Sequence, residues 1–325
     1  MPQNEPFLTV LDALLDENRP FPVRYLHRFS GLEPEDLKKL LKEWPQVSIR
    51  RKHSLLEDLE DLAAADTLIS FDNLARSLLD DADPQIRQRA IHLLWECDDP
   101  KLALLYLDML NKDEHVEVQA AAAHALGQFV NLGELDKIPA ELHHKIEDQL
   151  LETSASIKKA LVRRRALEAL GYSGRAEVGP LIEAAYREKD PAWVVSALLA
   201  MGRSCDDCWK EQILSQLRAH NDDIRSEAIH AAGESELKSA RPVLLDILED
   251  EEDLETRHEL IRALSRIGGE GVRAKLEELF DIEEDDEAAD FIEEALDSLS
   301  VTEDLGGFSL MDIDPELDFI EEDQE

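Results

Sequence analysis

The side chains of this sequence whose spacing could support chemistry are two cysteines, Cys205 and Cys208, in the C-x-x-C arrangement of zinc and redox sites. A structural zinc ion takes four ligands, and Cys97 is the one further cysteine in the chain. The motif also lies away from any strand-to-helix junction of the kind that carries a thioredoxin-like pair. We therefore expect a turn without function, with a labile disulfide or a metal shared between subunits as the alternatives.

Motifs for other reactions do not occur in the sequence. It contains no glycine-rich phosphate-binding loop and no G-x-S-x-G nucleophile motif. We therefore predict no catalytic residue, no cofactor and no metal centre, and we expect a protein that is not an enzyme.

The charge of the chain narrows the choice of partners. In 325 residues, 74 Asp and Glu outnumber 35 Lys and Arg, for a formal net charge of −39. This balance repels nucleic-acid phosphates and anionic membrane surfaces, so we expect neither nucleic-acid binding nor membrane insertion. The sequence begins without the basic and long apolar stretches of a signal peptide, and three cysteines fit a reducing compartment. These features favour a soluble, cytoplasmic protein.

The elements that carry these residues are copies of one ten-residue block, VRRRALEALG at 162–171. Related blocks start at 86, 118, 193, 224 and 256, with weaker copies at 288 and 49. The period is close to 32 residues, apart from one insertion of about twelve around Asn131 to Leu142, which we read as a loop. A second apolar segment with helical spacing precedes each block from 86 onward. Each unit is therefore predicted to be a helical hairpin.

The junctions between hairpins carry helix-start and close-packing signals. Asp83-Pro84 and Asp190-Pro191 place a capping carboxylate before a proline, and Asn221 and Asp253 hold the same position. Glycines 127, 171, 202 and 233 all follow nine residues after a block start, where a helix end or a close helix crossing favours the smallest residue.

These blocks resemble the HEAT-repeat family, in particular the short bacterial type that also occurs in bilin lyases. The resemblance covers roughly residues 32–300 and rests on the signature D-P-x-V-R-x-x-A-x-x-A-L-G. It implies an all-α protein, a right-handed α-solenoid in which the second helices line a concave face. One hairpin cannot bury enough apolar surface alone, so stacking is required. Residues 1–31, with helices near Phe7–Leu15 and Val23–Phe29, are expected to cap the N-terminal end.

The concave surface follows from the helical period. With positions numbered by their offset from the first residue of a block, offsets two and six point away from the apolar side. Offset two holds Gln88, Ala120, Arg164, Val195, Ser226 and His258. Offset six holds His92, His124, Glu168, Leu199, His230 and Arg262.

We expect this surface to bind a partner protein. It has one carboxylate, and its apolar centre, Val195 and Leu199, is flanked by Arg164 and Arg262, which suits a peptide that is both hydrophobic and acidic. The alternative is that a neighbouring helix covers Val195 and Leu199 as ordinary packing. The histidines at offset six are expected to be surface residues. The predicted partner-binding residues are Arg164, Val195, Leu199, His230, His258 and Arg262.

Two further features are read through the family resemblance. The arginines at offset one brace adjacent units in the family, which assigns a structural role to Arg87, Arg163, Arg225 and Arg257. Deoxyhypusine hydroxylase, a HEAT-like enzyme, holds two irons with His-Glu pairs at offsets two and three of several repeats. In this sequence His258-Glu259 fills that position once, which is too few ligands for such a site.

The last segment, residues 301–325, combines acidic and apolar residues. Gly306-Gly307 is expected to break any helix, and the charge density predicts disorder. The segment either binds another protein, folds back into the groove of its own chain, or only solubilises the protein. The apolar residues predicted to dock are Phe308, Leu310, Met311, Ile313, Leu317, Phe319 and Ile320.

The function predicted from these features is a non-enzymatic scaffold or adaptor that binds a protein or peptide in its groove. The alternative is a bilin lyase-like or chaperone-like accessory protein that acts on a chromophore protein.

Overall fold

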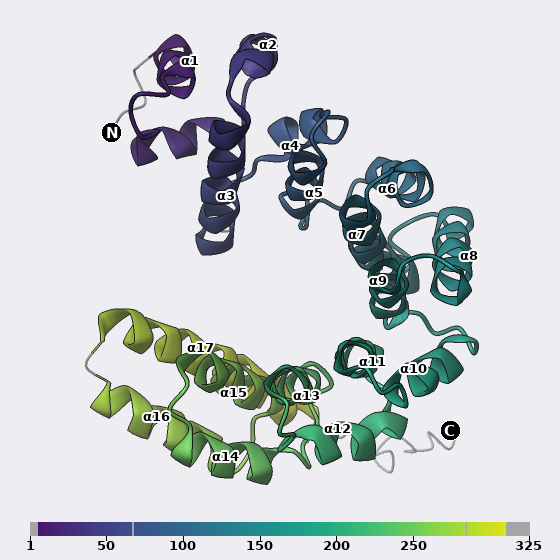
Figure 1. Cartoon of the computed structure of the whole chain (residues 1–325). Coiled ribbons are helices and arrows are strands. Elements are labelled where there is room, and N and C mark those ends of the chain that lie inside the picture. The colour runs from purple at the N-terminus through teal and green to yellow at the C-terminus, as the bar shows by residue number, and fades with distance from the viewer. Residues whose placement is uncertain (1–5, 67, 284, 310–325) are drawn as a thin grey trace, which may run out of the picture. The chain divides into compact units, whose positions relative to one another are not determined.

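The computed structural model describes residues 6–66, 68–283 and 285–309, apart from the side chains of residues 287 and 303–309. Its described residues form helices joined by short connections and contain no strand. The prediction of an all-α solenoid of hairpins is confirmed. Packing divides the chain into unit 1, Met1–Leu181, and unit 2, Ile182–Glu325, and Figure 1 labels the helices of each.

Unit 1 begins with the two helical segments expected before the repeats. Helix α1 (Phe7–Leu15) is followed by a 3-10 helix at Val23–Phe29, and the rings of Phe7 and Phe29 meet edge to face with centroids 6.1 Å apart. Helix α2 (Pro34–Glu43) and a 3-10 turn at Trp44–Gln46 lead to α3 (Ile49–Ala65), the first of the repeat blocks.

Three further hairpins complete unit 1. They pair α4 (Asp72–Leu78) with α5 (Pro84–His92), α6 (Pro100–Lys112) with α7 (Val116–Glu134), and α8 (Ala140–Ala155) with α9 (Ala160–Leu170). The second helices pack in sequence, α3 on α5, α5 on α7 and α7 on α9. This row of second helices is the arrangement expected from the repeated blocks.

The insertion in the repeat is not a loop, so that prediction is wrong. Helix α7 runs on to Glu134, a tight turn with Asp136 at φ 56° reverses the chain, and α8 starts at Ala140. Val130 and Ile146 are fully buried, so the added residues extend the hydrophobic contact between the two helices. Pro139 occupies the residue before α8 and starts the helix instead of marking a loop.

Unit 2 continues the same pattern of paired helices. Helix α10 (Val178–Tyr186) runs across the division, α11 (Pro191–Ser204) follows, and a 3-10 turn at Asp207–Trp209 leads into α12 (Lys210–Gln216). The remaining helices are α13 (Asp222–Glu234), α14 (Arg241–Asp250), α15 (Leu254–Ile267), α16 (Val272–Ile282) and α17 (Asp286–Ser309). Helix α13 packs between α11 and α15, and α15 packs on α17. These four second helices, α11, α13, α15 and α17, are called the inner row of unit 2.

Side-chain caps start four of the second helices, α5, α11, α13 and α15, as predicted. The carboxylates of Asp83 and Asp190 accept backbone N–H groups of the first helical turn at 2.9 to 3.2 Å. Asn221 and Asp253 do the same at 2.9 Å. Each cap satisfies a donor that the helix itself leaves unpaired, so the local sequence fixes the start of these four helices.

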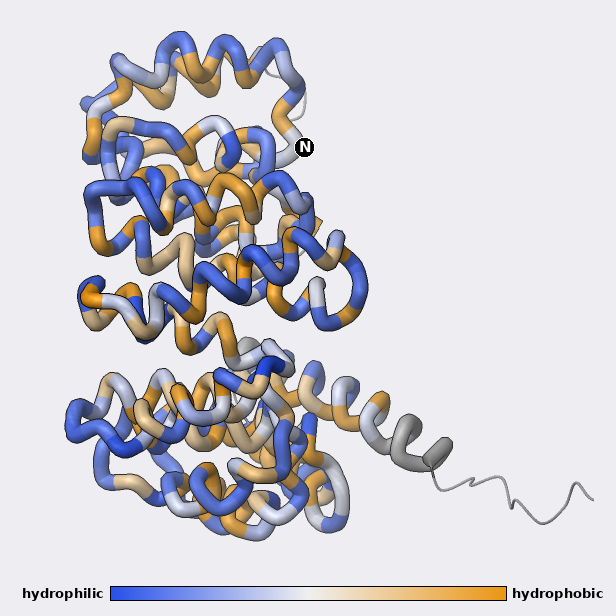
Figure 2. Tube along the Cα trace, turned by 90° about the vertical axis from the view of Figure 1, so that its right-hand side faces the viewer, coloured by the Kyte–Doolittle hydropathy of each residue, from blue (hydrophilic) through white to orange (hydrophobic). Residues whose placement is uncertain are grey.

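The glycines at offset nine mark close crossings between second helices. A Cβ added at Gly127, Gly202 or Gly233 would lie 3.1, 2.8 or 2.7 Å from the Cα of an alanine at offset seven of the next block, namely Ala169, Ala231 and Ala263. Small residues on both sides let the helix axes approach, and apolar residues beside them fill the core. Figure 2 shows hydrophobic residues alternating with hydrophilic ones along the helices, as expected for helices with one buried side.

The C-terminal end of the described chain departs from the prediction. Helix α17 extends to Ser309 and includes Gly306-Gly307, so the expectation that this pair ends the helix is wrong. A helical glycine costs only about 1 kcal/mol relative to alanine, which a helix already formed over several turns tolerates. None of the described helices combines the length and apolar character needed to cross a membrane.

Candidate functional site

The predicted partner-binding residues divide between the two units. Arg164 lies on α9 of unit 1 and is half-buried. Val195 and Leu199 lie on α11, His230 on α13, and His258 and Arg262 on α15, all in the inner row of unit 2. These five therefore belong to one series of packed helices, and the candidate surface is described within unit 2 alone.

His230 is the centre of an ion-pair network between α13 and α15. Its Nε2 lies 3.0 Å from the Glu234 carboxylate, and its Nδ1 lies 3.8 Å from that of Glu259. The hydrogen bond to Glu234 and, next, the nearby Glu259 carboxylate raise the pKa of His230 to about 10, so the imidazole is a cation at neutral pH. The Nη1 of Arg262 donates to Glu259 at 3.0 Å. A hollow of about 90 Å³ lies beside this network and is lined by His230, Gly233, Glu259, Arg262, Ala263 and Arg266.

An aromatic side chain of α17 completes this surface. The ring of Phe291 lies with its centroid 4.3 Å from that of His258, and the guanidinium carbon of Arg262 sits 5.1 Å from the centre of the Phe291 ring. The side chain of Arg262 is 57% exposed. Phe291 lies at offset three of the weak copy that starts at 288, outside the two offsets predicted to face the groove.

The apolar centre of the predicted surface is partly covered. Val195 and Leu199 are both half-buried on α11. Two other positions predicted to face the groove are buried in unit 1, because Ala120 is 4% and Glu168 is 2% exposed. The alanine-rich face of α7 packs on α9, and the buried Glu168 carboxylate lies 2.6 Å from Arg165 and 3.6 Å from His124. The offset rule therefore describes the inner row of unit 2 better than the corresponding helices of unit 1.

The sequence contains two pairs of possible metal ligands, His258-Glu259 and Cys205 with Cys208, and the structure places them in different surroundings. Glu259 pairs with His230 and Arg262, while the His258 ring packs on Phe291, so this His-Glu pair belongs to the inner-row surface. Cys205 and Cys208 are free and exposed. Partial burial, and for Cys208 a hydrogen bond to Asp206, raise the pKa of both thiols, that of Cys208 to about 11. A raised pKa lowers the thiolate fraction and with it the reactivity of the pair.

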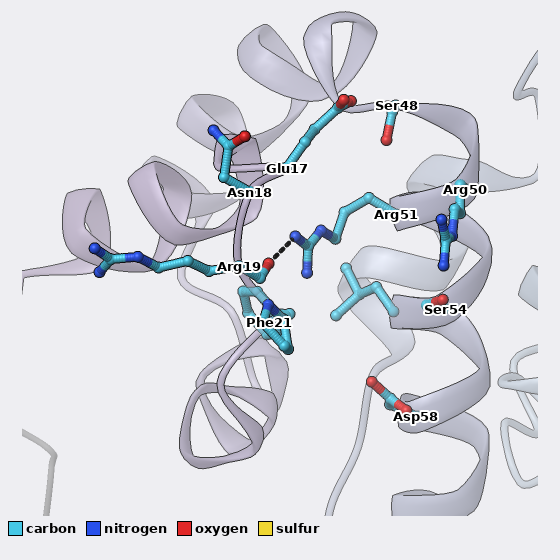
Figure 3. A pocket seen from close by; sticks show the side chains of 11 residues that line it. Glu17, Asn18, Arg19, Phe21, Ser48, Arg50, Arg51, Ser54 and Asp58 are labelled. Carbon is cyan, nitrogen blue, oxygen red and sulfur yellow. Dashed lines mark hydrogen bonds between the residues drawn. The ribbon is translucent and has the colours of Figure 1, made fainter.

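Unit 1 has a separate hollow of about 530 Å³ between residues 17–21 and α3. Figure 3 shows Arg51 reaching from α3 toward the chain at Arg19. The Arg51 Nη2 donates to the carbonyl oxygens of Asp16 and Arg19. This guanidinium therefore fastens the segment after α1 to the first repeat helix, which is a structural role.

The predicted docking residues of the tail lie at the limit of the described chain. Phe308 falls within α17, but its side chain is outside the described residues. The other six lie wholly outside them: Leu310, Met311, Ile313, Leu317, Phe319 and Ile320.

Comparisons with known proteins agree with the repeat pattern. The family model for HEAT repeats matches residues 72–140 and 211–297, and no curated protein matches the sequence significantly. The structure is similar to the YibA protein of Escherichia coli, with 19% identity over 88% of this chain and 99% of that one, and a TM-score of 0.41. It is also similar to human deoxyhypusine hydroxylase, with 18% identity over 80% and 95% and a TM-score of 0.35. For importin beta the identity is 12% over 94% of this chain and 48% of that one, with a TM-score of 0.42.

Proposed function

We propose that this chain, in which the HEAT-repeat model matches residues 72–140 and 211–297, works as a non-enzymatic interaction scaffold that binds a partner protein on the inner row of unit 2. Stacked hairpins present one repeated face of many side chains, and such a face suits an extended partner better than a small substrate. The residues proposed to bind are Val195, Leu199, His230, His258 and Arg262, joined by Phe291.

The observation that carries this proposal is the exposed arginine stacked on an aromatic ring. Arg262 and His258 both pack on Phe291, which gives a platform with an apolar face and a cationic edge. His230 adds a second positive charge nearby, because its pKa is about 10. The formal net charge of the chain is −39, so a platform with a cationic edge differs in charge from the chain as a whole.

The chemistry of the platform indicates the kind of partner. A guanidinium binds carboxylates with two parallel hydrogen bonds, and an aromatic ring packs on an apolar side chain. Glu259 and Glu234 balance part of the positive charge, so a highly acidic partner gains less than one that alternates acidic and apolar residues. Half-buried Val195 and Leu199 extend the apolar part of the surface along α11.

The acidic and apolar segment 301–325 has the composition of such a partner. Docking of this segment, in trans or in cis, stays a proposal. The residues proposed to dock are Phe308, Leu310, Met311, Ile313, Leu317, Phe319 and Ile320. Arg164 of unit 1 also stays a predicted contact. The bilin lyase-like or chaperone-like alternative stays a prediction from the family resemblance.

Peptide binding to single variants tests the proposal. Peptides that alternate acidic and apolar residues, selected from a display library on the full chain, are measured by fluorescence anisotropy against the wild type and against Arg262→Glu. We expect the variant to bind at least about tenfold more weakly, since one good charged contact is worth about 1.4 kcal/mol or more. Arg218→Glu is the matched control, because the Arg218 side chain is 59% exposed and also pairs with a carboxylate.

A chain that ends after Ser309 separates the two roles of the tail, since it leaves α17 intact. If the tail occupies its own surface, this shortened chain binds the selected peptide more tightly than the full chain does. Equal loss of binding in Arg262→Glu and Arg218→Glu, or no loss in either, would contradict the proposed surface.

A further inference from the structure

The longest hairpin of unit 1 contains a buried polar cluster that the scaffold function does not require. His143 and Glu147 lie one helical turn apart on α8, with 8% and 1% of their surfaces exposed. His144 is next to His143, and Glu134 stands at the end of α7. Buried imidazole and carboxylate groups are rare unless they are paired or bind a metal.

The distances within this cluster suit one shared ion. One ligand atom of each of His143, His144 and Glu147 lies within 4.8 Å of those of the other two. The Nε2 of His143 is 3.7 Å from the Glu147 Oε1 and 3.8 Å from the Glu134 Oε1. Ligand atoms around a tetrahedral zinc ion stand about 3.4 Å apart, so a contraction of the distances among His143, His144 and Glu147 would bring these three to bonding distance, with Glu134 close to His143.

The buried nitrogen of His143 gives an independent reason to expect a ligand. Its Nε2 is inaccessible to solvent and has no hydrogen-bond partner, although it points toward two carboxylates that lie beyond hydrogen-bond length. A buried ring nitrogen without a hydrogen-bond partner destabilises the fold, because its desolvation is not compensated. A metal ion between this nitrogen and the carboxylates would remove that cost and neutralise the buried negative charge.

Neighbouring groups already orient the carboxylates. The Oγ of Ser173 donates a hydrogen bond to the Glu147 Oε1, and the backbone N–H of Gly174 donates to the Glu134 Oε1 at 2.8 Å. Both donors come from the connection that follows α9. Supporting hydrogen bonds of this kind fix the ligands of metal sites in proteins.

A glycine fixes the position of the imidazole. A Cβ at Gly133 would lie 2.2 Å from the His143 ring, so the ring packs directly on the backbone of α7. This contact exists only because the insertion lengthens α7 and α8 by about one turn each. The departure from the regular repeat therefore builds the cluster.

We propose that His143, His144 and Glu147 of α8, with Glu134 of α7 as the fourth ligand, bind one zinc ion or a similar divalent transition metal. Two imidazoles and two carboxylates form a donor set that such ions accept, whereas magnesium and calcium take oxygen ligands. Bound metal would tie the end of α7 to α8 and to the connection after α9.

Cobalt titration followed by zinc competition tests this site. The full chain carrying Cys205→Ser and Cys208→Ser is stripped with a chelator and titrated with Co²⁺, whose visible absorption reports four-coordinate binding. We expect saturation at one equivalent, displacement by Zn²⁺, and a higher melting temperature with Zn²⁺. The cysteine substitutions remove the C-x-x-C pair as a competing ligand set.

Four further variants in the same background locate the ion. Glu147→Gln and His143→Gln are expected to weaken binding at least about tenfold, the loss that follows even when a supporting group of a metal site is removed. Glu134→Gln tests the fourth ligand at a side chain that is 36% exposed, so this variant keeps its fold if the two buried substitutions do not. His92→Gln is the matched control, because His92 also lies 3.7 Å from a carboxylate but on the surface. Absence of the one-equivalent absorption, or an affinity unchanged in Glu147→Gln and Glu134→Gln, would overturn the site.

Discussion

The arginines at offset one, Arg87 in unit 1 and Arg225 in unit 2, have partners that differ in burial. In unit 1, the guanidinium of Arg87 forms two hydrogen bonds of 2.8 and 2.9 Å to Asp113 and a third to the Asp81 carbonyl. In unit 2, Arg225 contacts Asp222, whose side chain is 86% exposed, and the carbonyl of Ala219. Both arginines brace the connection before their own helix, but only Arg87 has a buried bidentate partner.

Offset six shows the same contrast. In unit 1, the buried carboxylate of Glu168 is the centre of an ion-pair network between α7 and α9, and the exposed side chains of Arg165 and His124 surround it. In unit 2, His230 is the centre, and Glu234 and Glu259 surround it. The repeat fixes where a side chain lies on its helix, whereas neighbouring residues decide its charge and burial. One register position can therefore hold a buried carboxylate in one unit and a partly exposed cation in the other.

Removal of the bracing arginines should give the largest difference between the units. Arg87→Ala is expected to lower the free energy of unfolding by about 3 kcal/mol, because it leaves the Asp113 carboxylate, 9% exposed, without its partner. Arg225→Ala should cost about 1 kcal/mol or less, since its partner is exposed to solvent. Urea denaturation followed by circular dichroism measures both. Equal losses of unfolding free energy in the two variants would show that burial of the ion pair does not determine how much the arginine contributes to stability.

Filling the helix crossings should give an intermediate effect that grows from unit 1 to unit 2. Gly233→Ala places a Cβ 2.7 Å from the backbone of Ala263, and Gly127→Ala places one 3.1 Å from the backbone of Ala169. Overpacking costs about 1 to 3 kcal/mol, while alanine gains about 1 kcal/mol of helix propensity over glycine.

We therefore expect Gly233→Ala to lose about 1 to 2 kcal/mol and Gly127→Ala to be nearly neutral. The same urea experiment gives both values, and Gly179→Ala provides a control, because nothing lies within 4 Å of its added Cβ. A larger loss in Gly127→Ala than in Gly233→Ala would reverse the ranking of the two crossings.

Most of the fold could be predicted because the repeat signals are local. The caps at Asp83 and Asp190 and the apolar spacing of each block fix where helices start and which side they bury. The insertion was misread because its glycine and proline are common in loops. Gly133 is in fact needed for contact with His143, and that contact lies across a hairpin, where local sequence patterns give no signal.

The candidate surface was only partly predictable, for a related reason. The helical period identifies His258 and Arg262, but the partner that joins them, Phe291, comes from the next unit. Burial of Glu168 likewise depends on Arg165 and His124 and not on its own offset. The histidine cluster of α8 was missed altogether, although two imidazoles and a carboxylate at helical spacing, His143, His144 and Glu147, could have identified it.

The smallest expected effect is the pH dependence of the His230 network. Its folded-state pKa of about 10 exceeds the usual 6.5, so protonation stabilises the fold fully below about pH 6.5, and this contribution is lost as pH rises toward 10. The pKa values of Glu234 and Glu259 are lowered, so their contribution is present above about pH 4.5 and is lost in acid.

His230→Gln should therefore be less stable than the wild type by about 1 kcal/mol near pH 6, a value reduced by solvent screening because the side chain is 39% exposed. The difference should shrink toward pH 10. Urea denaturation at a series of pH values measures it, and a double-mutant cycle with Glu234→Gln assigns it to the pair, since either substitution alone removes the interaction. A difference in unfolding free energy that stays constant from pH 6 to 10 would mean that His230 acts through packing and not through its charge. Arg262 would then be the remaining cation of the proposed binding surface in unit 2.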